Sequence, residues 1–193
     1  MPSTATVNLE SLSPLSFSRH YTTDKLSKEL PKDYEVRTWR DRLHSDDNGE
    51  VFIPPMAPKH CVTEASRFLG MKIPGKRNAT YTKHFEAGVI VFDPIMLGVK
   101  KQDVRGEWLF VPSDGKRGGG SRVEKCFPLI PRWSGTVIFH ILDDTITEDV
   151  FKLHLEEAGN FIGIGRFRPR NSGYYGRFSV AKFKWEYTPR PSV

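Results

Sequence analysis

The chain has 193 residues, of which 38% are hydrophobic and 12% aromatic, and its formal net charge is +6. This length suits one domain with a sizeable core, and the aromatic content argues against a disordered chain. A basic excess favours polyanionic partners, chiefly nucleic acid. The start shows no basic segment followed by an apolar run, and the apolar stretches are short, so we expect neither a signal peptide nor a membrane span.

The cysteines and histidines give no sign of a metal or a disulfide framework. Cys61 and Cys126 are the two cysteines, and they lie far apart in the sequence. The six histidines are scattered, without metal-ligand spacing. Walker, dinucleotide-binding and nucleophile-elbow motifs are absent. We therefore expect no metal and no cofactor, and a reducing cytoplasm, bacterial or of a phage-infected host.

The first third of the chain predicts a strand, a polar segment, a second strand and a helix. Alternation of polar and apolar residues indicates a strand from Val7 to about Phe17. Residues 22–50 are polar and charged, and residues 50–54 form a short strand. A helix follows over residues 54–70, with Pro58 in its first turn and Gly70 as its left-handed cap. Its expected apolar stripe comprises Cys61, Val62, Ala65, Phe68 and Leu69.

The middle of the chain is basic and rich in turns. Residues 71–84 contain no acid, short strands are expected at 85–97 and 106–112, and a turn joins them. Residues 113–125 form a glycine-rich loop that carries Lys116, Arg117 and Arg122. We expect the region from about 71 to 131 to be an insertion within a single domain that spans residues 1–193.

A second regular block completes the chain. A strong strand is expected at 133–142, and a helix at 143–159, with Thr145 and Glu148 as its capping box and Gly159 at its end. The last strand covers 175–187, and the tail 188–193 is expected to be flexible. In the helix at 143–159, the expected core residues are Val150, Phe151, Leu155 and Ala158. This order predicts an α+β fold of the ferredoxin or RNA-recognition type, an antiparallel sheet with two helices.

The stretch GIGRFRPRNSGYYGRF, residues 163–178, combines four glycines, four arginines and four aromatics with no acid. Glycine lets a backbone approach a ligand closely, guanidinium groups match phosphate oxygens, and aromatic rings stack on bases. This composition therefore predicts a site for single-stranded nucleic acid. The plainer alternative is that the arginines are only solvated and Phe167 is core, and alternation places Phe178 in the core. The predicted contacts are Gly163, Gly165, Arg166, Arg168, Arg170, Tyr174, Tyr175 and Arg177.

Residues 158–180 resemble the C-terminal glycine-rich loop of the RAMP superfamily. These RNA-recognition-fold proteins form backbone subunits and guide-processing nucleases of CRISPR systems. The first glycine pair matches Gly163 and Gly165, and the second matches Gly173 and Gly176, one residue further apart than usual. Residues 51–70 are similar to the family's strand, proline loop and helix, although residues 55–57 replace the usual Gly-Ser pair. With residues 9–20 as first strand, the resemblance covers 9–20, 51–70 and 133–187.

The resemblance implies a modified ferredoxin-like domain that binds along a nucleic-acid strand. We expect it to bind RNA or single-stranded DNA without cleaving it. It also implies head-to-tail assembly into an oligomer or filament, with the mid-chain insertion as a thumb or hairpin on nucleic acid and neighbours. Cations outside the glycine-rich loop would then be further contacts, or exposed loop residues without a role. They are Lys72, Lys76, Arg77, Lys116, Arg117, Arg122, Lys59 and Arg19.

Two alternatives remain open. Guide-processing relatives cleave RNA by acid–base catalysis, and His20 or His60 could serve, with Arg19 or Lys59 stabilising the phosphate. The second alternative is a protein that copies the shape of a backbone subunit without binding nucleic acid, such as an inhibitor or a capsid-type component.

Overall fold

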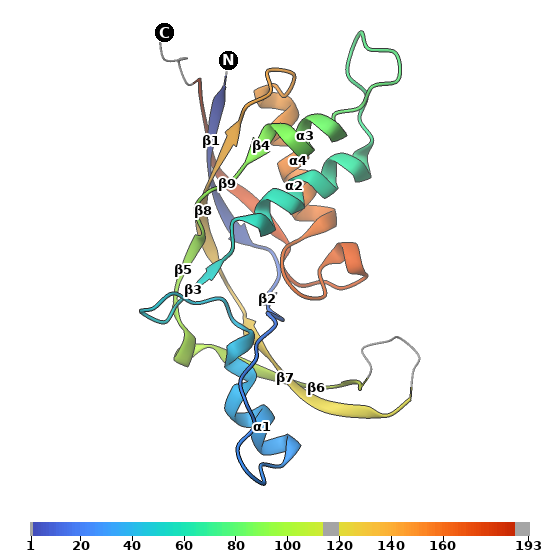
Figure 1. The fold of residues 1–193 in the computed structure, drawn as a ribbon. Helices are drawn as coiled ribbons and strands as arrows, with labels where there is room; N and C mark the ends of the chain where they lie inside the picture. Colours follow the sequence, from blue (N-terminus) through green and yellow to red (C-terminus); the bar gives the residue numbers. More distant parts are fainter. Residues whose placement is uncertain (1, 114–119, 188–193) are drawn as a thin grey trace.

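The computed structural model describes residues 2–113 and 120–187, and its main sheet confirms the predicted α+β fold (Figure 1). Four strands lie antiparallel in the order β4–β8–β1–β9. They are β1 (Ser3–Ser11), β4 (Val89–Ile90), β8 (Ser134–Ile141) and β9 (Phe178–Tyr187). Helices α2 (Met56–Leu69) and α4 (Glu148–Glu157) cover one face of this sheet. The chain order β1–α2–β4–β8–α4–β9 is that of a ferredoxin-like domain.

Strand β1 lies at the centre of the sheet and sets its register. It pairs with β8 from Ser3 opposite Ile141, and with β9 from Ser3 opposite Tyr187. Ala5, Val7 and Leu9 alternate toward the helices and are 0% exposed. Because side chains alternate between faces along a strand, this one register buries every apolar residue of β1 beneath α2 and α4.

Helix α2 follows its predicted pattern except at its last turn. Gly70 ends the helix in the left-handed region at φ 55°, as predicted. Cys61, Val62 and Ala65 are buried, but Phe68 is 53% exposed, so its placement in the core was wrong. The ring of Phe68 lies against Phe161 instead, at 5.3 Å between centroids.

Helix α4 begins and ends differently from the prediction. Its N-cap is Thr147, whose hydroxyl accepts a hydrogen bond from the backbone N–H of Val150 at 3.5 Å. Gly159 does not end the helix, because the chain continues as a π-helical turn, η3 (Ala158–Ile162). A Cβ at Gly159 would lie 2.1 Å from the carbonyl oxygen of Phe178. Glycine therefore serves close packing of this turn on β9.

Two expected strands have a different structure. The first ends at Ser11, and the separate strand β2 (Leu15–Ser16) pairs with β7 (Arg122–Ile130) of another sheet. The segment expected as a strand at 85–97 begins as helix α3 (Thr82–Gly88). In the segment read only as polar, residues 22–50, the chain forms helix α1 (Pro31–Thr38) and the 3₁₀ turn η1 (Trp39–Arg42).

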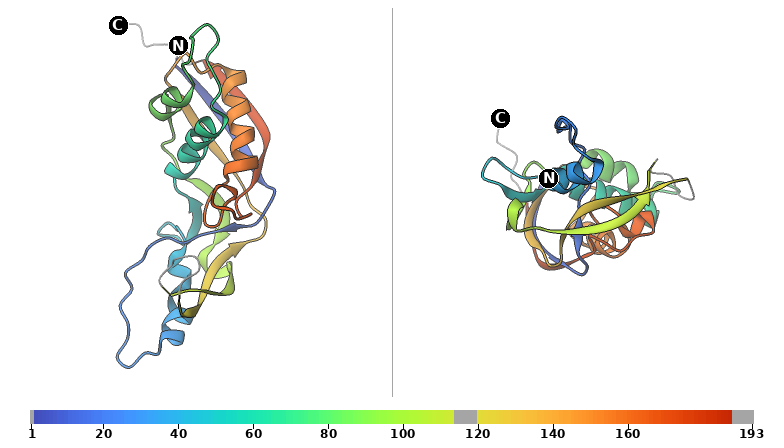
Figure 2. Two further views of the ribbon diagram at one scale, coloured as in Figure 1. Left: turned by 90° about the vertical axis from the view of Figure 1, so that its right-hand side faces the viewer. Right: turned by 90° about the horizontal axis from the view of Figure 1, so that it is seen from below.

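Residues 12–55, 91–113 and 120–133 build a second lobe below the main sheet, which we call the distal lobe (Figure 2). Its sheet has the order β2–β7–β6, with β6 (Arg105–Pro112) paired to β7 as a long hairpin. Strand β3 (Glu50–Ile53) pairs with β5 (Ile95–Lys100), which η2 (Lys101–Asp103) follows. The range expected as an insertion, residues 71–131, also contains α3 and β4, and β4 pairs with β8 in the main sheet. The distal lobe is built from chain segments on both sides of α2.

Some predictions fall outside the described residues: Lys116, Arg117 and the tail 188–193. No helix in the described part of the chain has the length and apolar character needed to cross a membrane.

Candidate nucleic-acid interface

The glycine-rich corner, residues 163–178, is held by contacts of its own backbone. Gly176 has φ 69°, and a Cβ there would lie 1.7 Å from the carbonyl oxygen of Ile164. Its N–H donates to the carbonyl of Pro14 at 2.7 Å, and its carbonyl accepts from the N–H of Ile164 at 3.0 Å. At Gly165, φ is 86° and a Cβ would meet the carbonyl of Ser16 at 2.5 Å. These glycines therefore allow chain segments to cross closely, and they fix the corner in place.

Arg168 pairs with a carboxylate of the protein itself. Its Nη1 lies 2.9 Å from Oε2 of Glu64, and its Nη2 donates to Oε1 at 3.1 Å. Nη1 also donates to the carbonyl of Gly163 at 3.4 Å. Because these contacts use much of its donor capacity, Arg168 ties the corner to α2 and is not free for phosphate.

Arg166 lies between two aromatic rings. Its guanidinium carbon is 3.5 Å from the centroid of Phe127 and 4.5 Å from that of Phe167. Burial lowers the pKa of Arg166, although Tyr175 and Glu107 act in the opposite direction. Its Nη1 is buried and finds no hydrogen-bond partner among the described residues. Arg166 thus retains an unused donor on the inner side of the corner.

Two arginines and two aromatic residues of the corner face solvent, and we call these four side chains the exposed corner: Phe167, Arg170, Tyr174 and Arg177. Phe167 is 44% exposed and Tyr174 is 58% exposed. Within the described residues, neither Arg170 nor Arg177 forms an ion pair. Two unpaired guanidinium groups and two exposed rings therefore share one rigid loop.

Tyr175 is 5% exposed and belongs to the interior of the corner. Its hydroxyl donates to Oε2 of Glu107 at 2.6 Å, which links the corner to β6. Burial, together with Glu107, raises the pKa of this hydroxyl. Its ring face is therefore not open to a base, while Phe178, 2% exposed, is in the core as predicted.

Lys59 is bound to α3, whereas Arg19 lines one pocket with Gly165 and Arg166 of the glycine-rich corner. The ammonium of Lys59 donates to the carbonyls of Phe85 and Glu86 at 2.8 and 2.7 Å, so it binds the end of α3. Burial lowers the pKa of Lys59. Arg19 is exposed and donates to the carbonyl of Leu43 at 3.4 Å.

The remaining predicted cations occupy other parts of the surface. Lys72, Lys76 and Arg77 are exposed on the loop after α2, which lies at the far end of the main lobe from the corner in both side views (Figures 1 and 2). Arg122 is exposed at the start of β7, in the distal lobe. The structure thus places the predicted cations in three regions.

The two candidate catalytic histidines are both exposed. His20 lines a polar pocket of about 430 Å³ together with Arg19, Asp41 and Lys101. The carboxylate of Asp41 pairs with Lys101 at 2.7 Å. His60 lies on the first turns of α2. Among residues 2–113 and 120–187, no three histidine, cysteine or acidic side chains are grouped so that they could hold a metal.

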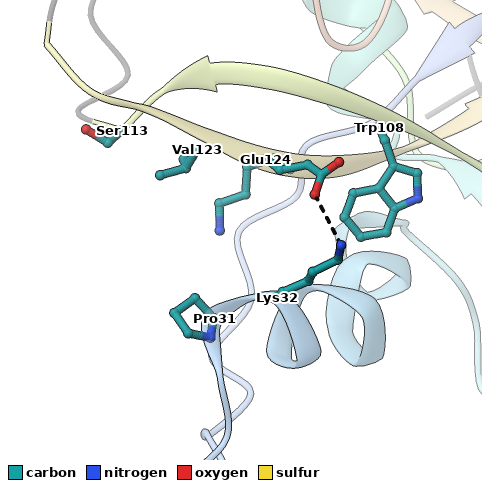
Figure 3. A pocket seen from close by; sticks show the side chains of 7 residues that line it. Pro31, Lys32, Trp108, Ser113, Val123 and Glu124 are labelled. Atoms are coloured by element: carbon teal, nitrogen blue, oxygen red, sulfur yellow. Dashed lines mark ion pairs between the residues drawn. The ribbon is translucent and has the colours of Figure 1, made fainter.

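The sequence did not indicate several candidate functional features that the structure shows. The exposed rings of Phe68 and Phe161 form a pair from α2 and η3, at the edge of the corner. A pocket of about 430 Å³ lies between α1 and the β6–β7 hairpin, where Lys32 reaches toward Glu124 beside Trp108 (Figure 3). The hydrophobic periodicity of the sequence does not indicate these residues, because they come together from distant parts of the chain.

No family model and no curated protein matches the sequence, but 77 chains of solved structures match the fold. One is a chain of the Type III-B Cmr-beta complex bound to cognate target RNA, with a TM-score of 0.54 and 12% identity over 96% of this chain. This chain spans 61% of that one. Cmr6 from Pyrococcus furiosus has a TM-score of 0.48, with 14% identity over 93% of this chain and 99% of its own.

A chain of a CRISPR RNA-guided surveillance complex has a TM-score of 0.35, with 11% identity over 91% of this chain and 66% of its own. At these identities the match to Cmr-beta establishes fold alone. The chain has a ferredoxin-like fold, as the sequence resemblance implied, and it shares this fold with the Cmr-beta chain.

Proposed function

We propose that the chain binds single-stranded RNA through the exposed corner, without cleaving it, as a subunit of a CRISPR-like ribonucleoprotein. The observation that supports this most directly is that one loop exposes Arg170 and Arg177, two guanidinium groups without ion pairs among the described residues, and the rings of Phe167 and Tyr174. The fold agrees, because the similar Cmr-beta chain comes from a complex bound to target RNA.

The physical basis is a rigid surface that offers both kinds of contact a single strand needs. Guanidinium groups bind phosphates and release counterions, and a base that stacks on an aromatic ring gains about 1–3 kcal/mol. The glycine contacts already fix the corner, so binding need not order a flexible loop. Arg168 stabilises the corner from behind through Glu64.

We further propose that several copies assemble head to tail along one strand, in a bacterial or phage-infected cytoplasm. The molecule is elongated, and its other basic regions lie at the loop 71–81 and at the hairpin of the distal lobe (Figure 2). Cations spread along a long molecule suit an extended strand or neighbouring copies. Light scattering should then show complexes whose mass rises in steps with RNA length, whereas a constant mass of one copy would contradict assembly.

The binding proposal is tested by titrating labelled single-stranded RNA and DNA at several salt concentrations. The double variant R170A/R177A should bind more weakly and should flatten the salt dependence by about 1.4 in log–log slope, because each lost contact to a single strand contributes about 0.7. The matched control is K182A/K184A, which removes two exposed cations from the sheet edge. Equal losses in both double variants would show that net charge, and not the corner, governs binding.

A second candidate is the endoribonuclease, because the pocket of about 430 Å³ places His20 beside Arg19 and Lys101. The same titration samples, run on a denaturing gel, test it. Shortened strands that disappear with H20A would establish cleavage at this pocket, and intact strands would leave the binding function. Absence of binding at low salt would instead support the backbone-subunit mimic.

A further inference from the structure

A small pocket opens beside the exposed corner, between Gly165 and the first turn of α2, and we call it the corner pocket. Its volume is about 190 Å³, below the roughly 300–1,000 Å³ of pockets that hold drug-sized ligands. Its floor is apolar and buried, formed by Phe17, Ile53 and Ile164. This space suits one flat ring system.

The rim of the corner pocket is rich in hydrogen-bond donors. Arg166 and Arg19 both line it, and Nη1 of Arg166 is buried without a partner among the described residues. A buried donor without a partner destabilises the protein, and an acceptor from a ligand would relieve this cost. His44 stands between Phe17 and Phe52, with centroids 5.9 Å away on each side. Burial and the nearby Arg19 lower the pKa of His44, so its ring is neutral at pH 7 and offers one donor and one acceptor.

We infer that the corner pocket takes one keto nucleobase, uracil or guanine, splayed out of the bound strand. This inference rests on the proposed RNA binding and deepens it by naming the base that the site selects. Guanidinium donors match O4 of uracil and O6 of guanine, whereas the amino groups at the same ring position in cytosine and adenine present donors to donors. A phosphate fits poorly here, because the apolar floor would strip its water without replacing those hydrogen bonds. Phosphates are left to Arg170 and Arg177 outside the pocket.

The test compares oligo(U) with oligo(C) of equal length by fluorescence anisotropy. Both are weakly stacked pyrimidine strands, and they differ in the O4 or N4 edge that the pocket would read. Wild-type protein should bind oligo(U) roughly tenfold more tightly, within the discrimination expected of a bidentate base contact. Uridine monophosphate should also compete with oligo(U) more effectively than cytidine monophosphate.

Two variants locate the preference. Ala57 lines the pocket from α2, so A57L should fill it, abolish the preference for oligo(U) and leave oligo(C) binding and the salt slope unchanged. The control A181L adds the same side chain at an exposed position of β9 and should keep the preference. If melting shows that A57L is unfolded, H44A serves as the second variant and should reduce the preference.

The outcomes separate the two proposals. Equal affinity of the wild type for oligo(U) and oligo(C), or a preference that persists in the folded pocket variants, overturns the keto-base pocket while RNA binding stands. Failure to bind either strand at low salt overturns the RNA-binding proposal, and the keto-base pocket with it.

Discussion

Replacing Glu35 should destabilise the distal lobe strongly, although the residue lies in a segment that looks merely polar. The carboxylate is 1% exposed and receives three donors. Its Oε1 lies 2.7 Å from Nη1 of Arg42 and accepts from the N–H of Cys126 at 2.9 Å, while its Oε2 accepts from Lys125 at 2.9 Å. These contacts hold α1 against β7.

The size of the effect follows from the burial of the partners. In E35Q the guanidinium of Arg42, whose side chain is 10% exposed, would remain buried without its carboxylate. Removing one partner of a buried ion pair costs about 3–5 kcal/mol. Lys125 is 35% exposed and can be hydrated, so it adds little. For a chain of 193 residues, this loss corresponds to a melting temperature lower by about 6–20 °C.

The acid limb of the stability curve gives a second measurement of the same carboxylate. Burial raises the pKa of Glu35, but the hydrogen bonds from Lys125, Cys126 and Arg42 outweigh it, and the net pKa lies below the ordinary 4.5. A lowered folded pKa means that this stabilisation is present above about pH 4.5 and is lost as pH falls through the folded value. E35Q should therefore flatten the curve of unfolding free energy below pH 4.5.

Urea unfolding followed by circular dichroism measures both effects, and the background R42M provides the control. In that background E35L should cost less than in the wild type, because no buried cation is left without a partner. The reasoning would be refuted if E35Q lowered the free energy of unfolding by less than about 1 kcal/mol. It would also be refuted if E35L cost as much in the R42M background as in the wild type.

Three further predictions concern the corner and the core. G176A should lower the melting temperature by several degrees, because its Cβ would meet a carbonyl oxygen at 1.7 Å, whereas G120A, with open space around it, should not. R168Q should cost about 1 kcal/mol in urea unfolding and leave RNA affinity unchanged, since this arginine binds Glu64. Burial lowers the pKa of His154, so stability should fall as pH drops below 6.5, and H154F should reduce that dependence in urea titrations.

Elements with an apolar period could be predicted from the sequence. Strands β1, β8 and β9 and helices α2 and α4 bury alternating or helically spaced apolar residues, and all five were predicted. The bounds of β8, β9 and α2 lie near the predicted ones, whereas β1 starts and ends earlier and α4 starts five residues later than expected. Helix α1 could not be predicted in this way, because the side chain that anchors it is the charged Glu35. Its burial depends on Arg42 and on Lys125, which lies 90 positions away.

The composition of residues 163–178 indicated where to look for a site, but not which of its side chains are exposed and which bind other parts of the protein. Arg168 and Arg170 stand two positions apart in an acid-free loop, yet the first pairs with Glu64, 104 positions earlier, and the second is exposed. Lys59 looked like a phosphate contact and instead binds carbonyls of α3. Such differences depend on tertiary partners, which local sequence does not identify.

The central place of β1 in the main sheet has a consequence for biosynthesis. Of the four strands of this sheet, β1 is made first, and it lies between β8 and β9, the two that are made last. Strand β1 therefore stays unpaired until β8 and β9 have been synthesised, and pairings between such distant segments form slowly. A nascent chain stalled before β9 would expose one edge of β1 to other chains. We expect chaperone demand and inclusion-body yield during expression to depend on how quickly the final strand emerges.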